Sequence, residues 1–107
     1  MFDKKKFATK GVVEQVSETI QSVLWSILVK ANKEKVELDY LQVFELSDAS
    51  TDDATIVQIK WSQEVPPMEK TFFVPFVKCD KTMKIWVISE AEGTEDEYAT
   101  MLFPEEY

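Results

Sequence analysis

One segment of the sequence has a regular apolar period, and it constrains the fold more than any other feature. Apolar side chains recur there at the three- and four-residue spacing of one helix face, at Val16, Ile20, Val23, Leu24, Ile27, Leu28 and Ala31. Ser17 is a suitable N-cap, and Glu18 suits the positive start of a helix. The pattern predicts an amphipathic helix over residues 17–33, with Lys30 and Lys33 near its negative end.

Most of the remaining chain consists of runs rich in β-forming residues. A first short strand with a bend at Gly11 is expected within residues 7–13. Alternation places Val57, Ile59 and Trp61 on one face of a strand, and Pro75 favours a sheet edge for the run that contains it. The short stretch at residues 78–82 has the length of a hairpin turn. The later strands are expected at residues 39–46, 55–63, 71–77, 83–89 and 98–103.

One helix and consecutive strands with short connections predict an α+β domain. We expect one amphipathic helix packed on a mostly antiparallel sheet of about five strands. The length of 107 residues fits a single domain over residues 1–107.

Several residue types are absent or rare, and their absence narrows the possible chemistry. The chain has no His and no Arg, one cysteine (Cys79), and only two glycines. It therefore lacks the residues for a His-dependent nucleophile, a structural zinc site or a Gly-rich phosphate loop. The sequence predicts no catalytic, cofactor-binding or metal site.

The compartment is also inferred from the sequence. A single cysteine cannot make an intramolecular disulfide, and the N-terminal residues lack the continuous apolar stretch of a signal peptide. The longest apolar run, at residues 23–29, is shorter than a membrane span. We expect a soluble cytoplasmic protein with no membrane contact.

Four stretches together resemble a known family. They are residues 9–12 (TKGV) before the helix with Leu24 and Trp25, residues 38–46 (LDYLQVFEL), residues 63–66 (QEVP) and residues 100–107 (TMLFPEEY). The chain resembles the small family described as staphylococcal protein of unknown function, from low-GC Gram-positive bacteria and their phages. The resemblance implies a bacterial or phage cytoplasmic protein, and it implies no activity.

Three groups of residues have the elements of a reactive site. Asp48, Asp52 and Asp53 offer oxygen ligands, but they lack the spacing and the glycine of a calcium loop. A carboxylate-dependent hydrolase would draw on Glu45, Glu64 and Glu69, and strands ordinarily carry such residues facing water. Cys79 lies between lysines that would lower the pKa of a thiol, although an incidental thiol is the simpler interpretation.

Charge is distributed unevenly. Lys4, Lys5, Lys6 and Lys10 form one basic cluster, but the net charge of −8 and the missing Arg argue against direct nucleic-acid binding. The segment 89–107 has seven acids and no lysine. An acidic decoy or regulator of a nucleic-acid-binding protein is therefore an alternative function, while a solubilising tail fits the clustering better.

The leading functional hypothesis rests on Trp25 and Val29. Relative to a stripe centred near Val16, Ile20 and Ile27, they point about 140° and 180° away. With the small neighbours Ser22 and Ser26, they form the candidate protein interface. The alternative is that residues 98–103 cover Trp25. We interpret the chain as a non-enzymatic interaction module that binds another cytoplasmic protein or forms a homodimer.

Overall fold

The long helix follows directly from its apolar period. In the computed structural model, which describes residues 1–107, this helix is α2 (Glu18–Lys33). The Ser17 hydroxyl accepts a hydrogen bond from the backbone N–H of Ile20 at 3.2 Å, so the predicted cap is confirmed. The buried side of the helix consists of Ile20, Leu24, Leu28 and Ala31.

The strands form one sheet with an order that departs from the sequence. The sheet has six strands in the order β1-β6-β5-β2-β3-β4. All neighbours are antiparallel except β1 and β6, which are parallel. The other elements are β1 (Lys5–Ala8), α1 (Lys10–Gln15), β2 (Leu41–Asp48), β3 (Ile56–Gln63), β4 (Met68–Pro75), β5 (Met83–Glu90), β6 (Tyr98–Leu102) and the 3-10 turn η1 (Pro104–Glu106). The mostly antiparallel α+β fold is confirmed, with one strand more than expected.

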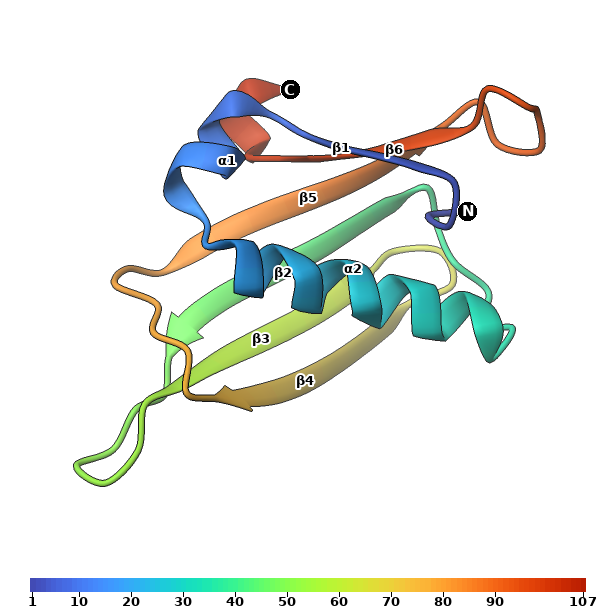
Figure 1. Cartoon of the computed structure of the whole chain (residues 1–107). Helices are drawn as coiled ribbons and strands as arrows, with labels where there is room; N and C mark the ends of the chain where they lie inside the picture. The colour runs from blue at the N-terminus through green and yellow to red at the C-terminus, as the bar shows by residue number, and fades with distance from the viewer.

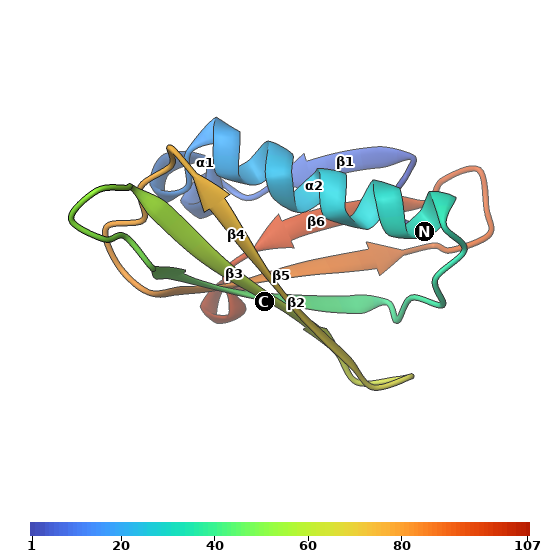
Figure 2. The ribbon, with the colours of Figure 1, turned by 90° about the horizontal axis from the view of Figure 1, so that it is seen from below.

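Only one face of the sheet is covered by helices. Figures 1 and 2 show α1 and α2 on the same side of the sheet, with α2 lying across the strands. Val57, Ile59 and Trp61 point toward this side and are buried, as their alternation predicts. They belong to a cluster of 18 buried residues that also contains Leu24 and Leu28. The opposite face, called the open face below, is covered by neither α1 nor α2, and only the short η1 turn lies on that side.

The expected hairpin at residues 78–82 is wrong. β4 is an edge strand, as Pro75 predicts, and it pairs only with β3. The chain then crosses to the centre of the sheet, where β5 lies between β2 and β6. Ile85 and Val87 are fully buried on one side of β5, and Ile88 is 6% exposed on the other side. A strand that is apolar on both sides is more stable in the middle of a sheet than beside an edge.

The expected first strand over residues 7–13 is also wrong in its second half. The strand ends at Ala8, and Thr9 caps α1 by accepting a hydrogen bond from the N–H of Val12 at 3.3 Å. Gly11 lies within α1 rather than at a bend. A Cβ atom at Gly11 would lie 2.6 Å from the Glu106 carboxylate, so glycine is required by a close approach.

The two acidic loops lie at opposite ends of the sheet (Figure 1). Residues 49–55 join β2 to β3, and residues 91–97 join β5 to β6. Most acids in these loops are exposed, but Glu97 is only 4% exposed. Its carboxylate lies 3.8 Å from the N-terminal ammonium and accepts a hydrogen bond from the N–H of Gly93. The expectation that all of this acidic segment is surface charge is therefore wrong at Glu97.

Candidate functional site

The four residues of the predicted helix interface differ in their exposure. Ser22 and Ser26 are exposed, and the Ser26 hydroxyl donates a 2.7 Å hydrogen bond to the Ser22 carbonyl. Trp25 is half-buried and packs against the buried cluster, and Val29 is half-buried. Measured from Leu24 on the buried side, Trp25 lies about 100° away and Val29 about 140°, whereas both serines lie about 160° away. Trp25 therefore flanks the core, and only the serines face solvent fully.

Trp25 lies closer to the core than the sequence predicts because the buried stripe is centred elsewhere. Val16 ends α1 instead of belonging to α2, and Ile27 is only half-buried. The centre of the stripe therefore shifts toward Leu24 and Leu28. Residues 98–103 mainly form β6, and Ala99 and Met101 belong to the same cluster that Trp25 contacts. The helix interface stays a prediction, now restricted mainly to its serine side.

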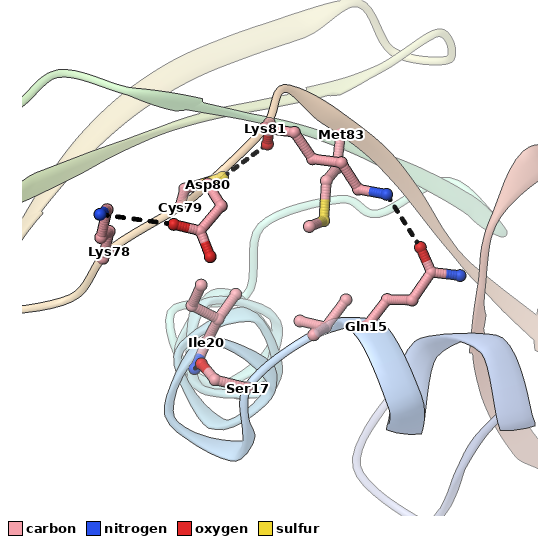
Figure 3. Close-up of a pocket in the computed structure, with 9 residues that line it drawn as sticks. Gln15, Ser17, Ile20, Lys78, Cys79, Asp80, Lys81 and Met83 are labelled. Atoms are coloured by element: carbon pink, nitrogen blue, oxygen red, sulfur yellow. Dashed lines mark hydrogen bonds and ion pairs between the residues drawn. The ribbon is translucent and has the colours of Figure 1, made fainter.

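A hollow of about 300 Å³ lies where α1 ends and α2 begins. Figure 3 shows its lining, which combines the two helices with the segment before β5. The Lys78 ammonium lies 3.6 Å from Asp80, and the Lys81 ammonium donates to the Gln15 side chain at 3.1 Å. The polar side chains here are therefore already engaged with partners in the same chain.

Cys79 lies in this hollow but does not have the features of a nucleophile. The residue is 3% exposed, and its thiol donates to the Lys81 carbonyl at 2.8 Å. Burial raises the pKa of the Cys79 thiol, and the negative charges of Asp48 and Asp80 raise it further, against a smaller lowering by the Lys81 backbone. The alternative of a thiol whose pKa is lowered by neighbouring lysines is therefore contradicted, and the thiol is buried. The thiol is less reactive than a free cysteine at neutral pH.

The carboxylates that a hydrolase would use are spread apart and paired with lysines. Glu45 lies 3.5 Å from Lys84, and Glu69 lies 3.6 Å from Lys60. Both pairs are on strands at partly or fully exposed positions, and Glu64 is exposed in the turn after β3. Glu45 and Glu69 each have a lysine partner, and Lys60 is paired in register with Glu45 as well.

The acidic loop after β2 is held by its own side chains. Asp48 accepts a hydrogen bond from the Ser50 N–H at 2.9 Å, and bonds from Ser50 lower the pKa of Asp48. The Thr51 hydroxyl accepts a hydrogen bond from the N–H of Asp53. The chain contains no group of three or more His, Cys, Asp or Glu residues arranged to hold a metal ion.

The basic cluster lies beside acidic and carbonyl groups. Lys4 donates a 3.0 Å hydrogen bond to the Thr94 carbonyl in the 91–97 loop, and Lys10 pairs with Glu14 at 3.8 Å. The exposed Phe7 ring packs edge-on against Tyr98. Lys4 therefore contacts the backbone of the 91–97 loop, whereas Lys10 is paired within α1. None of the helices is long and apolar enough to cross a membrane.

The open face carries a group of apolar side chains at its centre. Strand register brings residues of β2, β5 and β6 side by side on this face: Val43 pairs with Trp86, Trp86 with Leu102, and Leu41 with Ile88. We call these five residues the open-face patch. Leu41, Val43 and Trp86 are half-buried, whereas Ile88 and Leu102 are each only 6% exposed.

The chain's last residue touches the margin of this patch. η1 follows β6 to the open side of the sheet (Figure 2), and the Tyr107 ring packs edge-on against Trp86 with centroids 5.9 Å apart. Tyr107 itself is 81% exposed. The C-terminal turn therefore adds an aromatic ring that projects from the patch.

A charged row crosses the open face next to the patch. Strand register aligns Lys84, Glu45 and Lys60 on β5, β2 and β3. Charge alternates along this row, and it is balanced further by Glu69 on β4. The open face thus combines an apolar area with a row of nearly zero net charge, although the whole chain carries −8.

The stretches that carry the family resemblance meet in two polar clusters on other parts of the molecule. In the first, Gln42 accepts from the Trp61 indole N–H at 2.6 Å and donates to Gln63 at 2.8 Å. Asp39 joins this cluster through a backbone bond to Gln63 and a carboxylate bond to the N–H of Val65. Gln42 is fully buried, so the cluster holds the chain before β2 against the β3–β4 turn.

The second cluster joins the two ends of the domain. One oxygen of Glu106 accepts hydrogen bonds from the Thr9 hydroxyl and the Phe103 N–H, each at 2.8 Å. These bonds, with a contribution from the Gly11 backbone, lower the pKa of Glu106. Both clusters connect distant segments of the chain, so the residues that mark the family link parts of the fold together.

Sequence reasoning missed the open-face patch, although one of its signals was visible. The run that forms β2 is apolar on both sides, which a one-sided sheet does not require. The positions of Trp86 and Leu102 beside it depend on the strand order, which local patterns do not specify.

The comparisons with known proteins concern nearly the whole chain. A family model described as Staphylococcal protein of unknown function matches residues 5–106. No curated protein matches the chain. A crystal structure of a protein of unknown function from Enterococcus faecalis is similar, with a TM-score of 0.77 and 23% sequence identity. The similarity covers 99% of this chain and 94% of that one, and it supports the fold.

The match over residues 5–106 includes β1, both clusters and η1. The stretches that resemble the family in sequence are thus also the ones that hold the termini and the β3–β4 turn in place. The chain therefore belongs to the family of staphylococcal proteins of unknown function.

Proposed function

We propose that the chain is a non-enzymatic, cytoplasmic protein-interaction module and that the open-face patch is its binding surface. The observation that carries this proposal is the apolar group on β2, β5 and β6, on the side of the sheet that α1 and α2 leave uncovered. The uncovered face of an antiparallel sheet is ordinarily polar. A contiguous apolar area at the surface of a small protein is typical of a contact with another molecule.

The composition of the patch also supports a protein partner. Tryptophan and tyrosine are enriched among the residues that dominate binding energy, and here Trp86 and Tyr107 lie together. The charged row beside them supplies the polar margin of an ordinary interface.

The chemistry of the remaining side chains favours binding over catalysis. The chain has no His, its single thiol is buried with a raised pKa, and its central carboxylates are paired with lysines. These features argue against a His-assisted or thiolate nucleophile.

The acidic decoy receives less support from the arrangement of charge. A decoy needs carboxylates spread over one face, whereas the two acidic loops lie at opposite ends of the sheet. One of them is partly neutralised by the N-terminal ammonium and bonded by Lys4. Direct nucleic-acid binding is disfavoured by the same pairing of the lysines.

Photo-crosslinking in the native host tests the proposal. Val43 is replaced by the photoreactive residue p-benzoylphenylalanine, and adducts are identified by mass spectrometry after irradiation. We expect covalent adducts at position 43, because a partner would lie directly on this side chain. The matched control carries the same residue at Ser22, on the solvent side of α2.

The two positions distinguish the possible surfaces. Adducts at position 43 but not at position 22 support the open face. Adducts at position 22 alone would transfer the function to the helix face with Ser22 and Ser26. If a folded protein gives no adduct at either position, the chain is not an interaction module of this kind.

A further inference from the structure

We propose that the partner on the open-face patch is a second copy of this chain, related by a two-fold axis that runs between β2 and β5. The proposal rests on the proposed function and specifies its partner. In this arrangement the two sheets pack face to face with their strands aligned, as in a β-sandwich. Each position on β5 then meets the paired position on β2 of the other copy.

The apolar rows fit this symmetry. Trp86 is paired with Val43 within the chain, so across the axis each Trp86 lies on a Val43 of the second copy. Ile88 and Leu41 form the next row in the same way. A large side chain therefore faces a smaller one in the first row, so the interface closes without two tryptophans in collision. In the second row the half-buried Leu41 makes the contact, because Ile88 is only 6% exposed.

The charged row is self-complementary about the same axis. Lys84 and Glu45 are neighbours at 3.5 Å, on β5 and β2 respectively. The symmetry places Lys84 of each copy opposite Glu45 of the other, which gives two additional attractive pairs. The charged row of one copy is thus complementary to the charged row of the second copy. A different protein would need its own row of alternating charges at the same spacing.

Tyr107 also has a place in this arrangement. Its ring lies on Trp86, on the β6 side of the axis, and 81% of it is exposed. The position across the axis lies over β2 and β3, where Val43 and Ser62 are paired small residues. The tyrosine of one copy would therefore enter a shallow part of the other copy's surface.

Charge-reversal variants test the two-fold contact. The oligomeric mass is measured by light scattering over a concentration series from micromolar to millimolar. We expect Lys84→Glu and Glu45→Lys each to weaken the dimer by about tenfold or more, because each change places like charges opposite one another twice. The control Lys10→Glu reverses a similar exposed ion pair on α1 and leaves the dimer unchanged.

Recombination of the variants makes the test specific for a second copy. An equimolar mixture of Lys84→Glu and Glu45→Lys chains is expected to form a heterodimer of wild-type affinity, because every facing pair is again attractive. The double variant Lys84→Glu/Glu45→Lys is expected to dimerise as the wild type does. Thermal midpoints of all variants show that each chain is folded.

The possible outcomes separate this inference from the proposed function. A wild-type chain that remains monomeric at every concentration, or single variants that dimerise as well as the wild type, would overturn the two-fold contact. If the crosslinks at position 43 then identify a foreign protein, the interaction module stands and only its partner differs. If single variants weaken the dimer but their mixture does not restore it, the proposed axis is wrong.

Discussion

At the scale of single residues, the buried glutamine cluster is a structural requirement of the fold. Gln42 is fully buried and bonded to both Trp61 and Gln63. Leucine at this position would leave the indole N–H and the Gln63 oxygen without this partner. We expect Gln42→Leu to lower the free energy of unfolding by about 2–3 kcal/mol, measured by urea denaturation. The control Gln58→Leu, on the opposite side of β3, should change it by about 0.5 kcal/mol or less.

A second residue-scale prediction concerns Glu106 and acid. The hydrogen bonds from Phe103 and Thr9 lower the pKa of Glu106 below its ordinary value of 4.5. Because the folded-state pKa is lower than that of the unfolded chain, the carboxylate stabilises the fold above pH 4.5, and this contribution is lost as the pH falls through the lowered value.

We expect Glu106→Gln to lower the thermal midpoint at neutral pH. The difference in thermal midpoint between this variant and the wild type should become smaller as the pH approaches 3. Glu105→Gln serves as the neighbouring control, because the hydrogen bonds from Thr9 and Phe103 go to Glu106. If the difference in thermal midpoint between Glu106→Gln and the wild type is constant from neutral to acid pH, the charge of the Glu106 carboxylate does not stabilise the fold.

At the scale of elements, the sequence predicts local periodicity well and strand partners poorly. α2 is recognised from its stripe and cap, and the faces of β3 from their alternation, since both depend on neighbouring residues. β1 and α1 could not be separated in this way. The strand is stabilised by β6, about 90 residues away, and Gly11 by Glu106. The same limit explains the false hairpin at residues 78–82, where the burial of β5 on both sides decides its position.

Gly11 gives an element-scale prediction whose sign depends on a distant residue. Alanine ordinarily stabilises a helix by about 1 kcal/mol relative to glycine. Here the added Cβ would lie 2.6 Å from the Glu106 carboxylate, which is held by Thr9 and Phe103. We therefore expect Gly11→Ala to destabilise the wild type but to stabilise the Glu106→Ala variant, in a double-mutant cycle of unfolding free energies. A stabilising effect in both backgrounds would mean that the carboxylate moves aside at no cost.

At the scale of the whole molecule, the candidate surface exists only through the strand order. Val43, Trp86 and Leu102 come from three distant runs, and each run alone is an ordinary apolar strand. Once β5 lies between β2 and β6, the outward residues of all three become adjacent. The sequence shows that β2 is apolar on both sides, but it does not show which strands lie beside it. The helix site was easier to predict because its members are close in the sequence.

The net charge gives a prediction that distinguishes apolar contacts from ion pairs as the source of attraction between two copies. Each copy carries −8, so two copies repel one another at long range. Salt shortens the Debye length from about 10 Å at 0.1 M to about 3 Å at 1 M and so reduces this repulsion. The apolar rows around Trp86 are not weakened by salt, and the facing Lys84–Glu45 pairs are shielded from it by burial between the sheets. We therefore expect sedimentation equilibrium to show tighter dimers at high salt than at low salt, with Trp86→Ala weaker at every salt concentration. Dimers that dissociate as salt increases would show instead that ion pairs, rather than the apolar patch, supply most of the attraction between the copies.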